Sequence, residues 1–141
     1  MVLDKSVLFS DAQAVTATAA STNVLDLGAL GKTAYNAVQL KHNVGHKCIP
    51  LLIQVVEDFA DLTTLKIAVE SDDNSAFSSA KEIIAETVAL ADLKAGYVSV
   101  IEKLPRIKER YIRVKYTVTG TNPTLGKITA GIALAVDGSK S

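Results

Sequence analysis

The chain has 141 residues, of which 48% are hydrophobic, and its 15 basic and 15 acidic side chains give a formal net charge of zero. This length and composition predict one domain over residues 1–141, with a core of its own and a frayed tail at 137–141. A neutral chain without a basic block is not expected to bind nucleic acid or a membrane surface. The absence of Trp argues against a platform that stacks on bases or sugars.

Three features bear on where the chain is made. Cys48 is its only cysteine, which excludes an internal disulfide. Asp4 and Lys5 precede any apolar run, so no signal peptide is predicted. The longest apolar run, residues 49–56, is far too short to cross a bilayer. We therefore expect a soluble protein made in a cytoplasm.

The N-terminal part of the chain alternates short apolar stretches with turn residues. Residues 2–9 are predicted to form a strand that Ser10 and Asp11 break. Residues 12–22 are rich in Ala, Thr and Ser. They are predicted to be a strand or an extended segment, because β-branched residues favour extension over a helix.

The next region is less regular. A short strand is predicted at 24–27, closed by Gly28. Residues 29–47 are punctuated by glycine and are polar towards their end, so we expect mainly loop, with a brief strand pairing at 37–40 left open.

Two strands are expected in the middle of the chain. Residues 49–56 form the first, and Pro50 must lie at its start or on a sheet edge because proline cannot donate to a ladder. A turn at 57–61 leads to the second strand, at 62–69. The Ser-Asp-Asp-Asn-Ser run at 71–75 then predicts another turn.

Residues 80–93 are compatible with two structures. Residues 79–82 match a helix capping box, and Gly96 would end the helix. The apolar residues between them have helical spacing: Ile83, Ile84, Val88 and Ala91. The competing interpretation is a strand at 82–87 followed by a loop through Asp92. The sequence alone leaves helix and strand open over 82–93.

The C-terminal part predicts three strands. The first covers residues 97–101 and ends before Pro105, and the second covers 110–119, followed by a turn at 120–123. In the second strand one side carries Ile112, Val114, Tyr116 and Val118, and the other carries Tyr111, Arg113, Lys115, Thr117 and Thr119. This period of two indicates one buried and one wet face, which is typical of an antiparallel sheet. The third strand, 127–136, has Ile128, Ala130, Ile132, Leu134 and Val136 on one side.

These segments add up to about eight short strands with turn signals every ten or so residues. The pattern predicts an all-β fold, a single-domain antiparallel β-sandwich or jelly roll, rather than alternating strands and helices.

Few residues suggest chemistry. His42, His46 and Cys48 lie close together, as ligands of zinc would, but they sit in a glycine-containing loop without a fourth ligand nearby. Asp72, Asp73 and Asn74 lack the Gly and Glu that complete a calcium loop, so turn formation explains them better. We therefore expect no metal, no cofactor and no enzymatic activity.

Two surface features remain. A basic cluster surrounds one loop and strand: Lys103, Arg106, Lys108, Arg110, Arg113 and Lys115. Because Glu102 and Glu109 dilute it, a solvated face is favoured over a site for an acidic partner. The apolar residues of the N-terminal arm are candidates for oligomer or capsid contacts, although they also fit a plain first strand: Val2, Leu3, Val7, Leu8 and Phe9.

Four stretches, in order, carry a resemblance that covers nearly the whole chain. The first is Phe-Ser-Asp-Ala-Gln-Ala-Val-Thr (9–16) with Ala-Ser-Thr-Asn-Val-Leu-Asp-Leu-Gly (20–28), and the second is Leu-Lys-Ile-Ala-Val-Glu-Ser-Asp-Asp-Asn (65–74) with Phe-Ser-Ser (77–79). The third is Ala-Asp-Leu-Lys-Ala-Gly-Tyr (91–97) with Leu-Pro-Arg (104–106) and the strand at 109–120. The fourth is Gly-Lys-Ile-Thr-Ala-Gly-Ile (126–132). Together they resemble the capsid cement proteins of tailed bacteriophages, the group typified by the Bordetella phage cement protein. Residues 29–47 match none of these motifs.

The resemblance implies a jelly-roll-like fold, self-association into dimers, and binding to the outside of an icosahedral head, where such proteins clamp neighbouring major capsid subunits. It also favours the strand at 82–87. Two other functions compete with this one. A carbohydrate-binding β-sandwich for host adhesion would need an aromatic platform, and a small jelly-roll enzyme would have to use His42 and His46.

Overall fold

The computed structural model describes residues 2–28 and 49–135. The predicted loop at 29–47, the brief pairing within it and the predicted tail at 137–141 lie outside the described residues. The described part contains eight strands and one 3₁₀ turn. In chain order these are β1 (Val2–Ala14), β2 (Ala19–Ala20), β3 (Leu25–Asp26), β4 (Leu51–Glu57), β5 (Leu62–Asp72), β6 (Lys81–Ala89), η1 (Leu90–Asp92), β7 (Tyr111–Gly120) and β8 (Lys127–Ala135).

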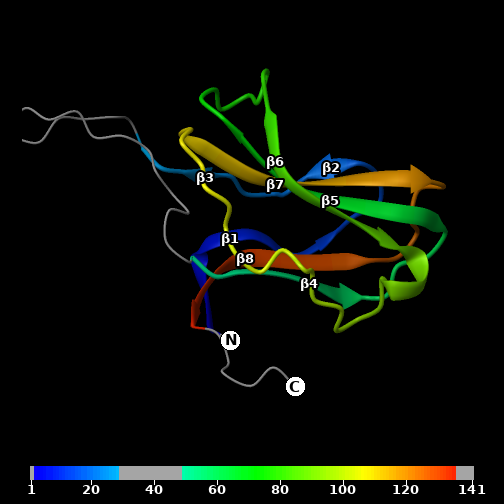
Figure 1. The fold of residues 1–141 in the computed structure, drawn as a ribbon. Helices are drawn as coiled ribbons and strands as arrows, with labels where there is room; N and C mark the ends of the chain where they lie inside the picture. The colour runs from blue at the N-terminus through cyan, green and yellow to red at the C-terminus, as the bar shows by residue number, and fades with distance from the viewer. Residues whose placement is uncertain (1, 29–48, 136–141) are drawn as a thin grey trace, which may run out of the picture.

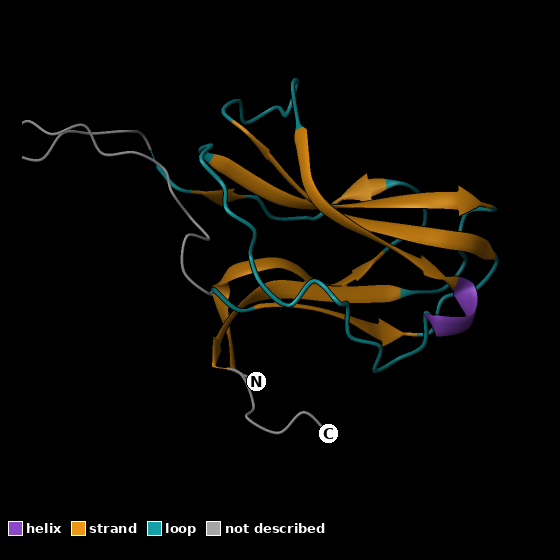
Figure 2. Cartoon of the chain, viewed as in Figure 1, coloured by secondary structure: helices purple, strands orange, loops and turns teal. Residues whose placement is uncertain are grey.

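The strands form two sheets that face each other (Figures 1 and 2). One sheet has three strands in the order β1-β8-β4, and the other has the order β2-β7-β5-β6 with β3 also paired to β7. Every strand pair is antiparallel. The predicted all-β antiparallel sandwich of about eight strands is therefore confirmed. No helix in this part of the chain is long and apolar enough to span a membrane.

Strand β7 is the central strand of the five-stranded sheet, as its alternating pattern suggests. It pairs with β5 over its whole length, from Leu62 opposite Gly120 to Asp72 opposite Tyr111. Ile112, Val114 and Tyr116 are buried on the side that faces the other sheet, and the residues between them are only partly covered. Residues of both sheets meet in one core that includes Phe9, Ile53, Leu65 and Ile128. Each such side chain stabilises the fold by about 1.5–3 kcal/mol through burial.

The first strand runs further than the sequence suggests. Ser10 and Asp11 do not break it, because β1 continues to Ala14 with several register shifts against β8. Ser10 is fully buried, and its hydroxyl forms a 2.8 Å hydrogen bond with the hydroxyl of Tyr116. That partner is 106 positions away in the sequence, so it could not be inferred from the local turn signal.

Residues 80–93 are not a helix. They form β6 followed by the short turn η1, and the strand is longer than the predicted 82–87. Pairing with β5 places Val88 opposite Leu65, where Val88 is buried. The backbone N–H of Ser79, which begins the apparent capping box, instead donates to Asp72 Oδ2 at 2.8 Å. Tertiary pairing has overridden a local helix signal.

The predicted strand at 97–101 is also wrong in detail. Within it only one isolated bridge forms, Val98 with Gln54, and a second bridge, Lys103 with Pro50, follows it. The segment is nevertheless extended along β4 and bonds to its backbone. Pro50 lies just before the first residue of β4, as expected for a residue that cannot donate to the ladder.

One boundary and one burial pattern differ from the prediction. The turn predicted at 71–75 starts later, because β5 continues through Asp72. In β8 the predicted alternation holds for Ile128 and Ala130, but Ala133 is buried where Ile132 is only partly so.

Candidate interaction surfaces

The residues that suggested metal chemistry form no site in the described structure. His42, His46 and Cys48 all lie outside the described residues, and the part that is described contains no group of three or more potential ligands. Asp72 serves a turn, because its carboxylate accepts the N–H groups of Asn74 at 3.0 Å and Ser79 at 2.8 Å. Partial burial raises the pKa of Asp72, but these backbone hydrogen bonds outweigh it, so the pKa lies below its usual value.

The basic cluster is partly built into the fold. Arg110 donates to both carboxylate oxygens of Asp26, at 2.7 and 3.1 Å, and so ties β3 to the start of β7. Arg113 donates to Glu70 at 2.9 Å, while its guanidinium lies 4.1 Å from the ring centroid of Phe77. Such bidentate and stacked contacts hold arginine in place. These two arginines therefore stabilise the five-stranded sheet and the loop before β6.

The predicted contact residues of the N-terminal arm belong to β1, the outer strand of the three-stranded sheet. Phe9 is 1% exposed and is a core residue. Leu3, Val7 and Leu8 are partly buried, and the side chain of Val2 lies outside the description. The arm is thus the first strand of the domain, and a role in contacts stays a prediction for its partly exposed members.

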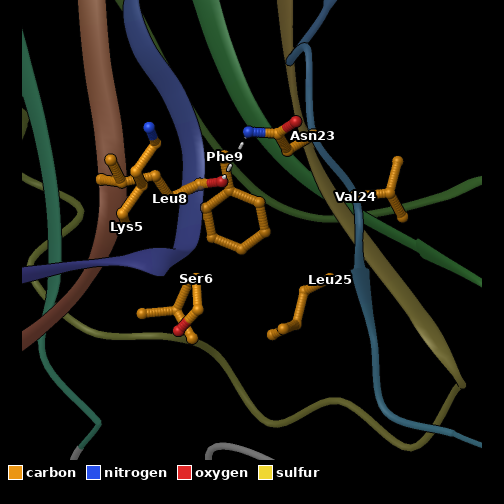
Figure 3. A pocket seen from close by; sticks show the side chains of 8 residues that line it. Lys5, Ser6, Leu8, Phe9, Asn23, Val24 and Leu25 are labelled. Atoms are coloured by element: carbon orange, nitrogen blue, oxygen red, sulfur yellow. Dashed lines mark hydrogen bonds between the residues drawn. The ribbon is translucent and has the colours of Figure 1, made fainter.

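A shallow hollow lies beside this strand (Figure 3). Between Leu3 and Leu8, β1 advances five residues while β8 advances two, so the intervening residues bulge outward. The hollow has a volume of about 310 Å³ and lies between residues 5–9 and residues 23–25. The side chain of Asn23 donates to the carbonyl of Leu8 at 3.2 Å and holds the two walls together.

A second surface lies at the other end of the five-stranded sheet, along its outer strand β6. Most of the strand is exposed, and both Ile83 and Ile84 are 39% exposed. The segment that follows η1 is tied to this strand through Glu86, and it carries Val98 at 47% and Val100 at 74% exposure. We call these four residues and the outer backbone of β6 the β6 edge.

Glu86 fixes the β6 edge to this segment. Its carboxylate accepts the hydroxyls of Tyr97 and Ser99 and the backbone N–H of Val100. Burial, and then the hydrogen bond to Glu86, raise the pKa of Tyr97 to about 12. An inward-facing carboxylate on an outer strand also discourages unspecific strand pairing.

A small hollow opens at the start of β6. It has a volume of about 220 Å³, is lined by Ile83 and the buried Ile107, and is rimmed by charge. The charged side chains at its rim are Lys81, Arg106, Lys108 and Glu109. Lys81 forms an ion pair with Glu109, which also accepts the hydroxyl of Ser71.

The β6 edge was not among the surfaces predicted from the sequence. The signal was present in the adjacent Ile83 and Ile84. In a regular strand neighbouring side chains point to opposite faces, so two adjacent isoleucines on an outer strand need cover on both faces or a local bulge. The open choice between helix and strand hid this signal.

The described part of the chain is thus a two-sheet antiparallel β-sandwich, with an exposed strand edge along β6 and shallow hollows beside β1 and at the start of β6. Residues 9–132 match the model of the Bbp16 family. Because the match covers most of the chain, the chain belongs to the Bbp16 family, whose name points to a Bordetella phage protein. A search among curated proteins found no match. Of the predicted contact residues, only Phe9 lies inside the matched range.

Proposed function

We propose that this chain is a structural virion protein that binds the outside of an icosahedral phage head and stabilises the lattice of the major capsid protein. The observation that carries the proposal is the match of residues 9–132 to the Bbp16 family, whose name points to a phage protein. The resemblance of the sequence motifs to capsid cement proteins supports the same role. The proposed partners are the major capsid protein and further copies of this chain, with a dimer expected.

The mechanism would be physical. A protein that binds only the assembled lattice stabilises it by linkage, by about 2.7 kcal/mol per site when its free concentration is about 100 times Kd. A dimer gains further, because its second contact forms at a high effective concentration. A formal net charge of zero suits dense coverage of a shell, since like-charged neighbours would repel.

The carbohydrate-binding alternative finds no support in the described aromatic residues. Phe9, Phe59, Phe77 and Tyr116 are buried, and Tyr97 and Tyr111 are partly buried. A sugar platform needs an open aromatic face. The enzyme alternative rests on His42 and His46, which lie outside the described residues, and stoichiometric metal in the purified protein would support it.

The proposal is tested by quantitative mass spectrometry of gradient-purified virions of the phage that encodes the chain. We expect a copy number comparable to that of the major capsid protein. A few copies per particle would move the protein to the tail or a vertex, and its absence from the particles would overturn the proposal.

A further inference from the structure

The outer backbone of β6 is an open sheet edge. Within the described residues, β6 pairs only with β5, and no backbone hydrogen bond joins its other side to a neighbouring segment. The loop before β6 projects from the sandwich, so the first residues of the strand extend past the cover of the second sheet (Figure 1). An exposed outer strand is a ready template for pairing with another strand.

A bulge places both isoleucines on one side of this edge. Glu82 lies opposite Glu70 and Ile84 lies opposite Val69, so Ile83 is an extra residue in β6 that has no partner of its own on β5. Ser71 and Val69 point to the core side of the sheet. Ile83 points the same way, because it lines the hollow that Ser71 and Ile107 also line. Glu82 points to the opposite face, where it binds Lys66 at 2.7 Å.

The resulting pattern is symmetric. Along residues 81–86 the side chains point to the core side, outer side, core side, core side, outer side and core side. The pattern reads the same in both directions about the point between Ile83 and Ile84. Directly opposite residues of two antiparallel strands must share a face, so β6 matches a second β6 running the other way.

Charge disfavours the competing register. With a twofold axis between Ile83 and Ile84, each Ile83 lies opposite the partner subunit's Ile84, and each Lys81 lies opposite the partner subunit's Glu86. A register centred on Ile84 itself would place Glu82 opposite the partner's Glu86, which sets like charges together and mismatches their faces. The symmetric register is therefore favoured by apolar contact and by side-chain direction, and it avoids the like-charge pair of the competing register.

We propose that a second copy of this chain binds along β6, with the two strands antiparallel about a twofold axis between Ile83 and Ile84. Such an isologous contact joins the two five-stranded sheets into one continuous sheet and closes both open edges. The inference rests on the self-association included in the proposed function, but not on binding to a phage head.

The test is sedimentation equilibrium of the full chain and its variants over a range of concentrations. We expect the unmodified chain to dimerise. Ile84→Lys should raise the dimer Kd by about a hundredfold or more, because the introduced ammonium groups would be desolvated beside each other and beside Lys81. Val56→Lys is the matched control, because Val56 is 40% exposed on the outer strand β4, and its Kd should not change.

A second, milder variant distinguishes loss of the interface from misfolding of the chain. Ile84→Thr keeps a β-branched side chain and should weaken the dimer about tenfold while leaving the circular dichroism spectrum unchanged. A chain that stays monomeric at all concentrations, or a dimer that Ile84→Lys and Ile84→Thr leave intact, would overturn the inference. A β6 dimer that is absent from virions would contradict head binding alone. Abundance on virions with a dimer formed elsewhere would contradict this inference alone.

Discussion

The outer strands β4 and β6 differ in how their outer backbone groups are hydrogen-bonded. Both end a sheet and so leave backbone donors and acceptors unpaired on one side. For β4 the segment at 96–104 supplies the partners, with Val55 N–H donating to the Tyr97 carbonyl and Ser99 N–H to the Ile53 carbonyl, both at 2.9 Å. For β6 no described backbone segment does so.

One segment of the chain accounts for this difference between the two edges. The segment that covers β4 is anchored in the core by Ile101, Leu104 and Ile107, all nearly inaccessible. It also reaches β6, but only through the side chain of Glu86. Among the described residues, the chain thus closes the edge of β4 with its own backbone and leaves the edge of β6 open.

The largest expected effect comes from loosening the segment at 96–104 that covers β4. Leu104→Ala should lower the free energy of unfolding by about 2–5 kcal/mol, because it leaves a cavity beneath the covering segment. Urea denaturation measures the loss. Val100→Ala, four residues away and 74% exposed, should change it by no more than about 0.5 kcal/mol. Equal effects of the two substitutions would show that the segment is not anchored as described.

The tie between the two edges is tested at Glu86. Glu86→Ala should cost about 1–3 kcal/mol, because the buried hydroxyl of Ser99 loses its acceptor. Glu82→Ala is the control on the same strand, since it removes only the exposed ion pair with Lys66 and should cost about 1 kcal/mol or less. A Glu86→Ala protein as stable as the control would contradict the role of this carboxylate.

Within β6, core and edge residues should respond differently to the same kind of change. Val88→Thr should destabilise a single copy by about 1–3 kcal/mol, because it buries a hydroxyl at a position that is 3% exposed. Ile84→Thr should cost less than about 1 kcal/mol at concentrations where the chain is monomeric. If Ile84→Thr proved the more damaging of the two, Ile84 would be a core residue rather than part of an interface.

The smallest expected effect is at alkaline pH. The folded-state pKa of Tyr97 is raised to about 12, whereas an unfolded tyrosine has a pKa of about 10. The unfolded chain therefore loses this proton first, and the stabilisation present below pH 10 declines as the pH rises towards 12. Tyr97→Phe should reduce this decline without removing it, because burial also raises the pKa of Tyr116. Identical pH profiles of stability would contradict the raised pKa of Tyr97.

Alternation along the chain predicted the strands that lie in the middle of a sheet. Ile112, Val114 and Tyr116 in β7, and Ile128 and Ala130 in β8, show their buried faces directly in the sequence. Along these residues one face packs on the core and the other is partly exposed, so burial imposes a clear period of two.

The secondary structure of the outer elements was harder to predict from the sequence, because it depends on partners far away in the chain. Residues 80–93 satisfy a helix locally, and only pairing with β5 decides for a strand. The segment at 97–101 looks like a strand, yet it forms only one isolated bridge with β4. The β6 edge could not be recognised before β6 itself was placed, because its symmetric pattern depends on the bulge at Ile83.

Hydrogen exchange of the unmodified chain at low and high concentration tests the contrast between the two edges most directly. We predict that amides of β4 are protected at both concentrations, because its cover belongs to the same chain. The N–H groups of residues 81–86 that point away from β5 should exchange rapidly in the monomer and become protected as the dimer forms, whereas those that bond to β5 should be protected at both concentrations. Protection of the outward-pointing amides that is independent of concentration, or that fails to rise when the dimer forms, would contradict the account.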